Sequence, residues 1–220
     1  METNINSIFS TPIYMSKINR ELTPLELKFV DKNKKDHYKN DGNITSNNNY
    51  ILNEKPFVDI KKDLDLRVKD YFDKVISPAN NIIPYITQSW LNYTETNQYH
   101  HKHAHPNSLV SGVFYINCHK EHDKIKFFND NYKTIKLEVK DWNMWNSETW
   151  WFSVKTGDII LFPSSLTHMV ETKQGDNTRI SLAFNVFITS FAGLSFKIKF
   201  LFFFIVLLIS FISSILYKFL

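Results

Sequence analysis

The feature that most constrains this 220-residue chain is a histidine-rich segment that runs directly into an apolar one, between Tyr99 and Asn117. Four of the eight histidines fall within six positions, at His100, His101, His103 and His105. A Pro-Asn-Ser turn follows, and then an apolar run, Leu109–Ile116, that is typical of a buried strand. Alternate side chains of an extended segment share a face, so two of these histidines can converge on one metal ion. The segment predicts a metal site where a strand enters a β-structured core.

Two later segments strengthen this interpretation, because a histidine run alone also occurs on exposed loops. Asp158–Pro163 is a short apolar strand, and His168 lies five positions beyond its last residue. Eleven residues beyond His168, Arg179 begins another strand and Ser181 lies two positions on. The order His-x-His, distant His, Arg-x-Ser favours a built site over scattered polar residues.

These segments resemble the 2-oxoglutarate/Fe(II)-dependent oxygenases, in particular a family with SWLN, HxHPNSxxSGVxYI and GDxxLFPSxLxH…RISxxFN segments. The matching residues are Ser89–Asn92, His103–Ile116 and Gly157–Asn185. The resemblance extends roughly from Ile8 to Ile188. It implies a mostly β fold, a double-stranded β-helix (jelly roll), with Fe(II) and 2-oxoglutarate as cofactors.

Length and composition set few further limits. The chain has the length of one domain, which we place at residues 1–190. The net charge of +4 is spread along the chain and does not indicate nucleic-acid binding. The single cysteine, Cys118, excludes an internal disulfide and fits a reducing compartment. The first residues lack a signal-peptide pattern, so we expect a cytoplasmic catalytic domain.

Two helices are expected outside the sheets. Thr23 followed by Pro24 and Glu26 predicts a helix start, and this helix should end near Lys35. A 3.6-residue apolar period from Phe57 to Val75 predicts the second helix.

Several other segments have local patterns. We expect a short edge strand at Ser7–Tyr14, a strand at Ile86–Tyr93 and a loop at Asn40–Asn49. Ile125–Phe128 should form a hairpin with residues 135–139. The tryptophan-rich stretch, Trp142–Phe152, is either a wall of the core or a lid over the substrate mouth.

The resemblance assigns metal ligands but leaves an open question. Such oxygenases use two imidazoles and one carboxylate, and the distant histidine is here His168. His105 stands where most members carry an acid. Three arrangements remain open: all of His103, His105 and His168; two histidines with water or chloride, and His105 outside the coordination sphere; or His101 with His103, and His105 contacting substrate. We favour the first.

The co-substrate would be held by a cation. Arg179 supplies a planar fork for the far carboxylate of 2-oxoglutarate, and Ser181 shares its strand face. Asn92 is a further candidate contact. His101 and Tyr99 are candidates for supporting contacts around the ligands.

The composition changes sharply beyond residue 190. Residues 200–217 carry no charge and are flanked by lysines, a span of about 27 Å at helical rise. This hydrophobic tail, residues 191–220, is a candidate apolar helix and C-terminal membrane anchor. The other interpretation is an extension that plays no part in the domain.

The resemblance implies a dioxygenase that couples substrate oxidation, as a hydroxylase, to O2-dependent decarboxylation of 2-oxoglutarate to succinate. The substrate is not identified by the sequence. The alternatives are a cupin-like metal-binding protein without 2-oxoglutarate chemistry, and a membrane-tethered binding module with a decayed site.

Overall fold

The computed structural model of the chain describes residues 1–130, 135 and 137–190. Two α-helices are present in this part, α1 (Pro24–Lys35) and α2 (Val58–Tyr71), the latter continuing as a π-helical turn, Phe72–Ile76. Short 3-10 turns at Ile51–Asn53 and Lys55–Phe57 precede α2. The strands are β1 (Tyr14–Lys17), β2 (His37–Lys39), β3 (Ile44–Ser46), β4 (Ile82–Thr94), β5 (His100–His103), β6 (Val110–Asn117), β7 (Lys124–Phe128), β8 (Thr149–Ser153), β9 (Asp158–Pro163), β10 (His168–Val170) and β11 (Arg179–Ser190).

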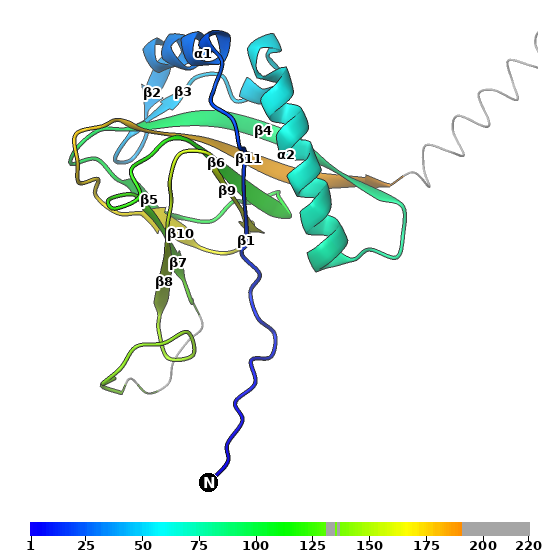
Figure 1. Ribbon diagram of the computed structural model, residues 1–220, viewed down its shortest axis with the longest axis vertical. Coiled ribbons are helices and arrows are strands. Elements are labelled where there is room, and N and C mark those ends of the chain that lie inside the picture. Colours follow the sequence, from blue (N-terminus) through cyan, green and yellow to red (C-terminus); the bar gives the residue numbers. More distant parts are fainter. Residues whose placement is uncertain (131–134, 136, 191–220) are drawn as a thin grey trace, which may run out of the picture.

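The described strands form two antiparallel sheets. The larger has the order β1-β9-β6-β11-β4-β3-β2, and the smaller has the order β5-β10-β7-β8. Figure 1 shows α1 and α2 on one side of the larger sheet and the smaller sheet on the other. The expected mostly β, jelly-roll type of architecture with helices outside it is therefore confirmed.

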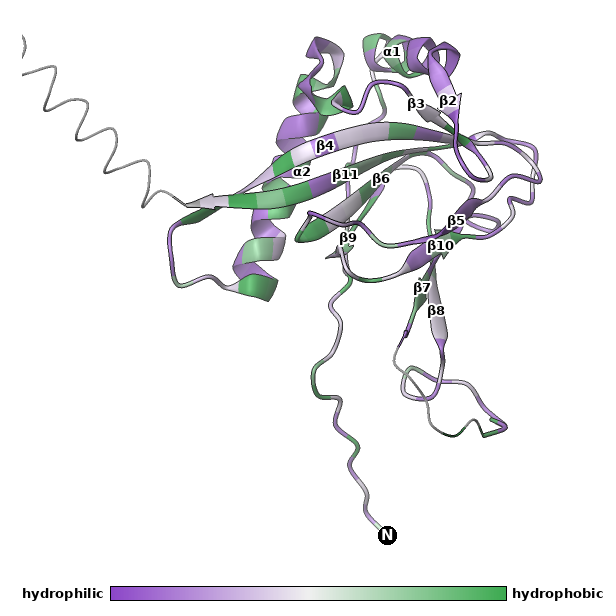
Figure 2. Cartoon of the chain, turned by 180° about the vertical axis from the view of Figure 1, so that it is seen from behind, coloured by the Kyte–Doolittle hydropathy of each residue, from purple (hydrophilic) through white to green (hydrophobic). Residues whose placement is uncertain are grey.

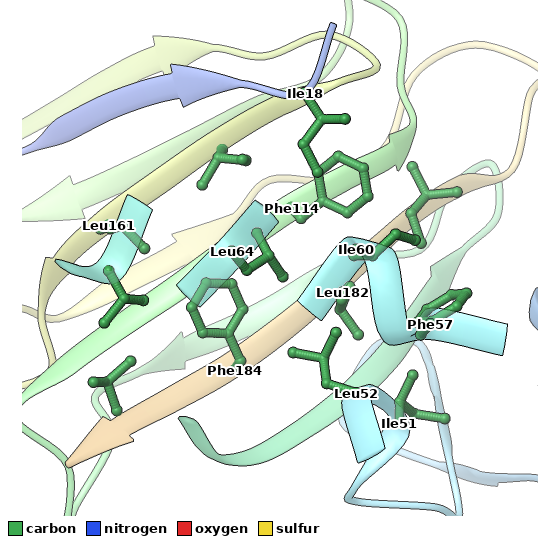
Figure 3. Packing of buried hydrophobic residues seen from close by; sticks show 14 of the residues in the cluster. Ile18, Ile51, Leu52, Phe57, Ile60, Leu64, Phe114, Leu161, Leu182 and Phe184 are labelled. Atoms are coloured by element: carbon green, nitrogen blue, oxygen red, sulfur yellow. The ribbon is translucent and has the colours of Figure 1, made fainter. Parts of the chain in front are cut away.

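Strand alternation divides the core into two layers, because successive side chains of a strand point to opposite faces. On β11, Leu182 and Phe184 pack toward α2, where Ile60 and Leu64 meet them (Figure 3). Figure 2 shows hydrophobic residues recurring along α2, while β5 is hydrophilic throughout. The helix-side layer is thus the main apolar core.

The opposite face of the larger sheet carries the second layer, between the two sheets. Tyr115, Ile160 and Phe162 from β6 and β9 pack here against Ile125 and Phe127 of β7. This smaller cluster does not fill the space between the sheets. The remaining cavity is lined by alternate residues of two neighbouring strands. These are Trp90, Asn92 and Thr94 of β4 and Arg179, Ser181 and Ala183 of β11.

The helix predictions are confirmed. The side chain of Thr23 accepts a hydrogen bond from the backbone N–H of Glu26, and the Glu26 carboxylate accepts one from the N–H of Thr23. This reciprocal cap fixes the start of α1 at Pro24. In α2, Ile60, Leu64, Val68 and Tyr71 are buried at the predicted spacing.

Three strand predictions were wrong. Residues 7–13 form no strand, and β1 begins only at Tyr14. The predicted loop Asn40–Asn49 contains β3, which pairs with β4 and so gains hydrogen bonds that its polar composition does not suggest. β7 pairs with β10 on one side and with β8, Thr149–Ser153, on the other, rather than with residues 135–139.

The tryptophan-rich stretch contributes to the core only at its end, where Phe152 of β8 packs against the cluster between the sheets, and its tryptophans are largely exposed. The exposed fraction is 61% at Trp142, 60% at Trp145 and 51% at Trp151. None of these residues lines the two cavities described below.

The predicted apolar C-terminal helix and membrane anchor lie outside the described residues. Among the helices that the structure describes, none is long and apolar enough to cross a membrane.

Candidate metal and co-substrate site

Three histidines predicted as metal ligands come together between the sheets. His103 ends β5, His168 begins β10, and the two residues are direct register partners. His105 follows β5, and its backbone N–H donates to the carbonyl of Ser164. The ring nitrogens of His103, His105 and His168 that could bind one ion lie within 4.8 Å of one another.

Hydrogen bonds fix the orientation of all three rings. The Nδ1 of His103 donates to the carbonyl of His101 at 2.8 Å, and that of His168 donates to the carbonyl of Leu166 at 3.1 Å. The Nδ1 of His105 donates to Oδ1 of Asn185 at 2.7 Å. Because each acceptor is an oxygen, each Nδ1 carries the proton and each Nε2 keeps a free lone pair. Such outer contacts are typical of metal-binding histidines.

The unprotonated state of these rings is also favoured by burial. Desolvation lowers the pKa of His168 to about 3 and the pKa of His103 to about 4. It also lowers the pKa of His105. All three imidazoles are therefore neutral near pH 7, as metal coordination requires.

The donor set fits a metal ion. The Nε2 atoms of His103 and His105 lie only 3.1 Å apart, and two lone pairs at this distance repel each other unless a cation lies between them. Two nitrogen ligands at right angles around an ion, with bonds of about 2.1 Å, are about 3.0 Å apart. No Asp or Glu lines either cavity in the described part of the chain, so the histidines bring no negative charge to the ion.

Arg179 lies in the same cavity as the histidines. Its side chain is buried at the start of β11, and Nη1 donates to Oδ1 of Asp123 at 3.2 Å. Its Nη2 is buried and has no hydrogen-bond partner among the described residues. Ser181 and Asn92 are register partners that also line the cavity, and Oδ1 of Asn92 accepts a hydrogen bond from Thr45.

The surroundings of Arg179 carry an excess of positive charge. Asp123 and Lys173 are both fully buried, and the Lys173 ammonium lies 3.9 Å from the Asp123 carboxylate. One carboxylate thus faces two cations, which leaves a formal charge of +1 in a buried cluster. An anion beside the unpaired Nη2 of Arg179 would offset that charge.

Sequence reasoning missed Asp123 and Lys173, because each follows a polar turn with no periodic pattern around it. Asn185 had a signal, since it ends the RISxxFN segment, but its role as acceptor for His105 was not predicted. His100 was also missed as a cavity residue; its ring stacks on His103 with centroids 4.8 Å apart.

The two predicted supporting residues are placed differently. His101 supplies the carbonyl that orients His103, and its own buried Nδ1 has no partner in the described structure. Tyr99 lines neither cavity, because its hydroxyl donates to Asp41 on the surface.

Two further groups of side chains could hold an ion. His100, His101 and His103 form one, which shares His103 with the buried triad. His119, Glu121 and His122 form the other, on the exposed turn after β6.

Comparison with known families identifies the domain. Residues 88–185 match the model of a family described as "Putative 2OG-Fe(II) oxygenase". This segment, slightly less than half of the chain, is similar to the 2OG-Fe(II) oxygenases. The predicted enzyme class and its cofactors, Fe(II) and 2-oxoglutarate, are confirmed at the level of this family.

Solved structures share the fold of this chain at low sequence identity. An oxidoreductase of the 2OG-Fe(II) oxygenase family from Burkholderia pseudomallei has 13% identity and a TM-score of 0.52, with coverage of 79% of this chain and 83% of that one. HygX from Streptomyces hygroscopicus, solved with nickel, 2-oxoglutarate and hygromycin B, has 11% identity and a TM-score of 0.51, covering 80% and 82%. A Pseudomonas putida prolyl-4-hydroxylase has 10% identity and a TM-score of 0.51, covering 80% and 93%. A comparison with curated proteins gave no match.

Proposed function

We propose that this oxygenase is a hydroxylase that binds Fe(II) through His103, His105 and His168 and holds 2-oxoglutarate with Arg179 and Ser181. The observation that carries the proposal is the meeting of three free Nε2 lone pairs and one unpaired guanidinium nitrogen in a single cavity. When bound, iron and 2-oxoglutarate supply the oxidising chemistry, in which O2 is consumed and 2-oxoglutarate is decarboxylated to succinate.

This ligand set is favoured over the other two arrangements left open by the sequence. The ring of His105 is held by Asn185, whose Oδ1 also accepts a hydrogen bond from Ser111, so His105 is as firmly oriented as the other two. The ring of His101 has no such contact at Nδ1. These contacts support a set of three imidazoles as the ligands.

The chain's own residues would bind and orient the co-substrate. The excess charge of the Asp123, Lys173 and Arg179 cluster would attract a carboxylate, and Asp123 holds the guanidinium at Nη1 while Nη2 has no partner among the described residues. Ser181 and Asn92 would add neutral hydrogen bonds. The inner cavity, about 40 Å³, is small, so side chains along it must move to admit a molecule of the size of 2-oxoglutarate.

The organisation of the whole chain stays a prediction from the sequence. We infer a catalytic domain at residues 1–190 and a separate hydrophobic tail at 191–220, with residues 200–217 as a membrane anchor for a cytoplasmic enzyme. Such a tether would place the substrate near a bilayer.

The test is anaerobic titration of the metal-free protein with Fe(II) and then 2-oxoglutarate. The proposal predicts the visible charge-transfer absorption of an Fe(II)–2-oxoglutarate chelate, its loss in His105→Ala, and its weakening in Arg179→Lys, which keeps the charge but loses the fork. The double variant His119→Ala/His122→Ala removes the exposed group of ligands and should leave the absorption unchanged.

Two other outcomes would contradict the proposal. Metal binding without any response to 2-oxoglutarate would indicate the cupin-like alternative. Binding of neither would indicate a binding module with a decayed site.

A further inference from the structure

A wider groove adjoins the inner cavity and has a volume of about 660 Å³. Trp90, His100, His103 and His105 line both spaces, so a molecule in the groove would lie directly against the histidines of the site. The volume falls within the range of small-molecule sites, roughly 300–1,000 Å³. The groove is therefore suited to the substrate of the oxygenase.

Within the described part of the chain, the lining of the groove contains no lysine, arginine, aspartate or glutamate. Apart from the histidines, its polar side chains are amides and hydroxyls. The amide side chains come from four separate segments and are Asn40, Gln88, Asn107 and Asn185. An amide both donates and accepts hydrogen bonds, as does a hydroxyl group.

Aromatic rings supply the rest of the recognition surface. Tyr38 and Tyr50 are 46% and 53% exposed, so much of each ring is free to contact a ligand. Trp90 is held by stacking on His105, with ring centroids 5.7 Å apart and planes inclined by 24°. Flat aromatic faces of this kind contribute apolar contact area, while the amides fix orientation.

This chemistry disfavours charged substrates. Apart from a metal ion held by the histidines, the groove offers no cation to a phosphate or carboxylate and no carboxylate to an ammonium group. The buried cations, Arg179 and Lys173, do not line the groove, and Arg179 lines the inner cavity instead.

Addition of a peptide strand is also poorly supported. Two sheet edges contribute to the groove, β2 and β5. They are only three and four residues long, which leaves little backbone for a partner strand to pair with.

We propose that the groove binds an uncharged, polyhydroxylated ring, of which a sugar unit or a cyclitol is the model, and presents it to the metal centre. The role of this ring as the substrate rests on the proposed function, whereas its binding does not. The hydroxyls would pair with the amides, and the apolar face of the ring would pack on Tyr38, Tyr50 or Trp90.

The experiment measures binding without turnover, on the metal-free full chain, so that a carboxylate or phosphate cannot bind to an open metal ion. Saturation-transfer NMR is recorded with a panel of neutral hexoses, disaccharides and inositols, and with charged partners of the same size, such as hexuronates and hexose phosphates. We expect binding of a neutral member and at least about tenfold weaker binding of its charged partner, as follows from an unpaired charge in the groove.

A pair of exposed glutamines provides the matched control. Gln88→Glu places a charge in the groove and should weaken binding of the neutral ligand at least about tenfold. Gln174→Glu places the same charge on the surface outside the groove and should have no effect.

Each remaining outcome overturns the proposal. These outcomes are no binding by any neutral polyol, equal or tighter binding of the charged partners or of an uncharged peptide amide, and no response to Gln88→Glu. If a neutral polyol binds but the Fe(II)–2-oxoglutarate absorption never forms, only the proposed reaction fails. If that absorption forms and no polyol binds, only the groove proposal fails.

Discussion

Replacing Asp123 with asparagine should destabilise the metal-free protein more than replacing its partner Arg179 with glutamine. Asp123 is fully buried; it accepts the N–H of His119 at 2.8 Å and faces both Arg179 and Lys173. Asp123→Asn leaves two buried cations without a carboxylate, and breaking a buried pair in this way costs about 3–5 kcal/mol. Arg179→Gln leaves the Asp123–Lys173 pair balanced and removes the unpaired Nη2, so its cost should be about 1–2 kcal/mol.

The assay is urea unfolding of the metal-free and 2-oxoglutarate-free protein at pH 7.5. With a slope of about 2 kcal/mol per M, Asp123→Asn should lower the midpoint by about 1.5 M or more and Arg179→Gln by less than about 1 M. Asp176→Asn, an exposed acid in the same loop as Lys173, is the control and should not move the midpoint. If Arg179→Gln destabilises the protein as much as Asp123→Asn, the cluster carries no excess positive charge, and the argument for a bound anion is lost.

Three further predictions follow from named contacts. Asn185→Ala removes the hydrogen-bond acceptor of His105 and should weaken metal binding about 10–100-fold, as measured by competition titration with Zn(II). An unchanged affinity for Zn(II) would show that Asn185 does not support His105 as a ligand. The folded pKa values of His168 and His103 lie below the unfolded value of about 6.5, so the unfolded chain takes up these protons first. The free energy of unfolding of the metal-free protein should therefore be highest above about pH 6.5. It should fall by up to about 1.4 kcal/mol per pH unit for each histidine as the pH falls toward 4. An identical dependence of the unfolding free energy on pH in His168→Ala would refute this. Gly112→Ala would place a Cβ 2.1 Å from Cζ of Phe184 and should lower the free energy of unfolding by about 1–3 kcal/mol, measured as a lower urea midpoint. An unchanged midpoint would show that Phe184 moves aside freely.

The sequence predicted the parts of the fold that depend on local patterns. The cap at Thr23 and the stripe of α2 were readable because both depend on residues three or four positions apart. Strands β6, β9 and β11 were readable as apolar runs. In contrast, β3 is a short polar segment that becomes a strand only because β4 lies beside it, and nothing in Ile44–Ser46 itself reports that neighbour.

The pairing of β7 shows the same limit. Its own residues predicted a strand, but the choice between residues 135–139 and β8 depends on where the chain returns after a long connection. The alternation of apolar residues near Ile135 was a plausible signal, although Ile135 and Leu137 are 73% and 75% exposed.

The candidate site divides in a similar way. Its histidines and Arg179 were predicted from their chain order, and the structure brings them into one cavity. Asp123 could not be predicted, because an acid after a polar turn is common on surfaces and its burial depends on Lys173, fifty positions away. The groove lining could not be predicted either, since its amides come from segments that meet only in the folded protein.

The central claim is that three imidazoles and Arg179 act on one bound complex, and a structure determined anaerobically with Fe(II) and 2-oxoglutarate tests it most directly. We predict one iron ion bound to Nε2 of His103, His105 and His168, with the distal carboxylate of 2-oxoglutarate at Nη2 of Arg179. Iron held at the His100–His101–His103 group, or 2-oxoglutarate with no contact to Arg179, would contradict the account.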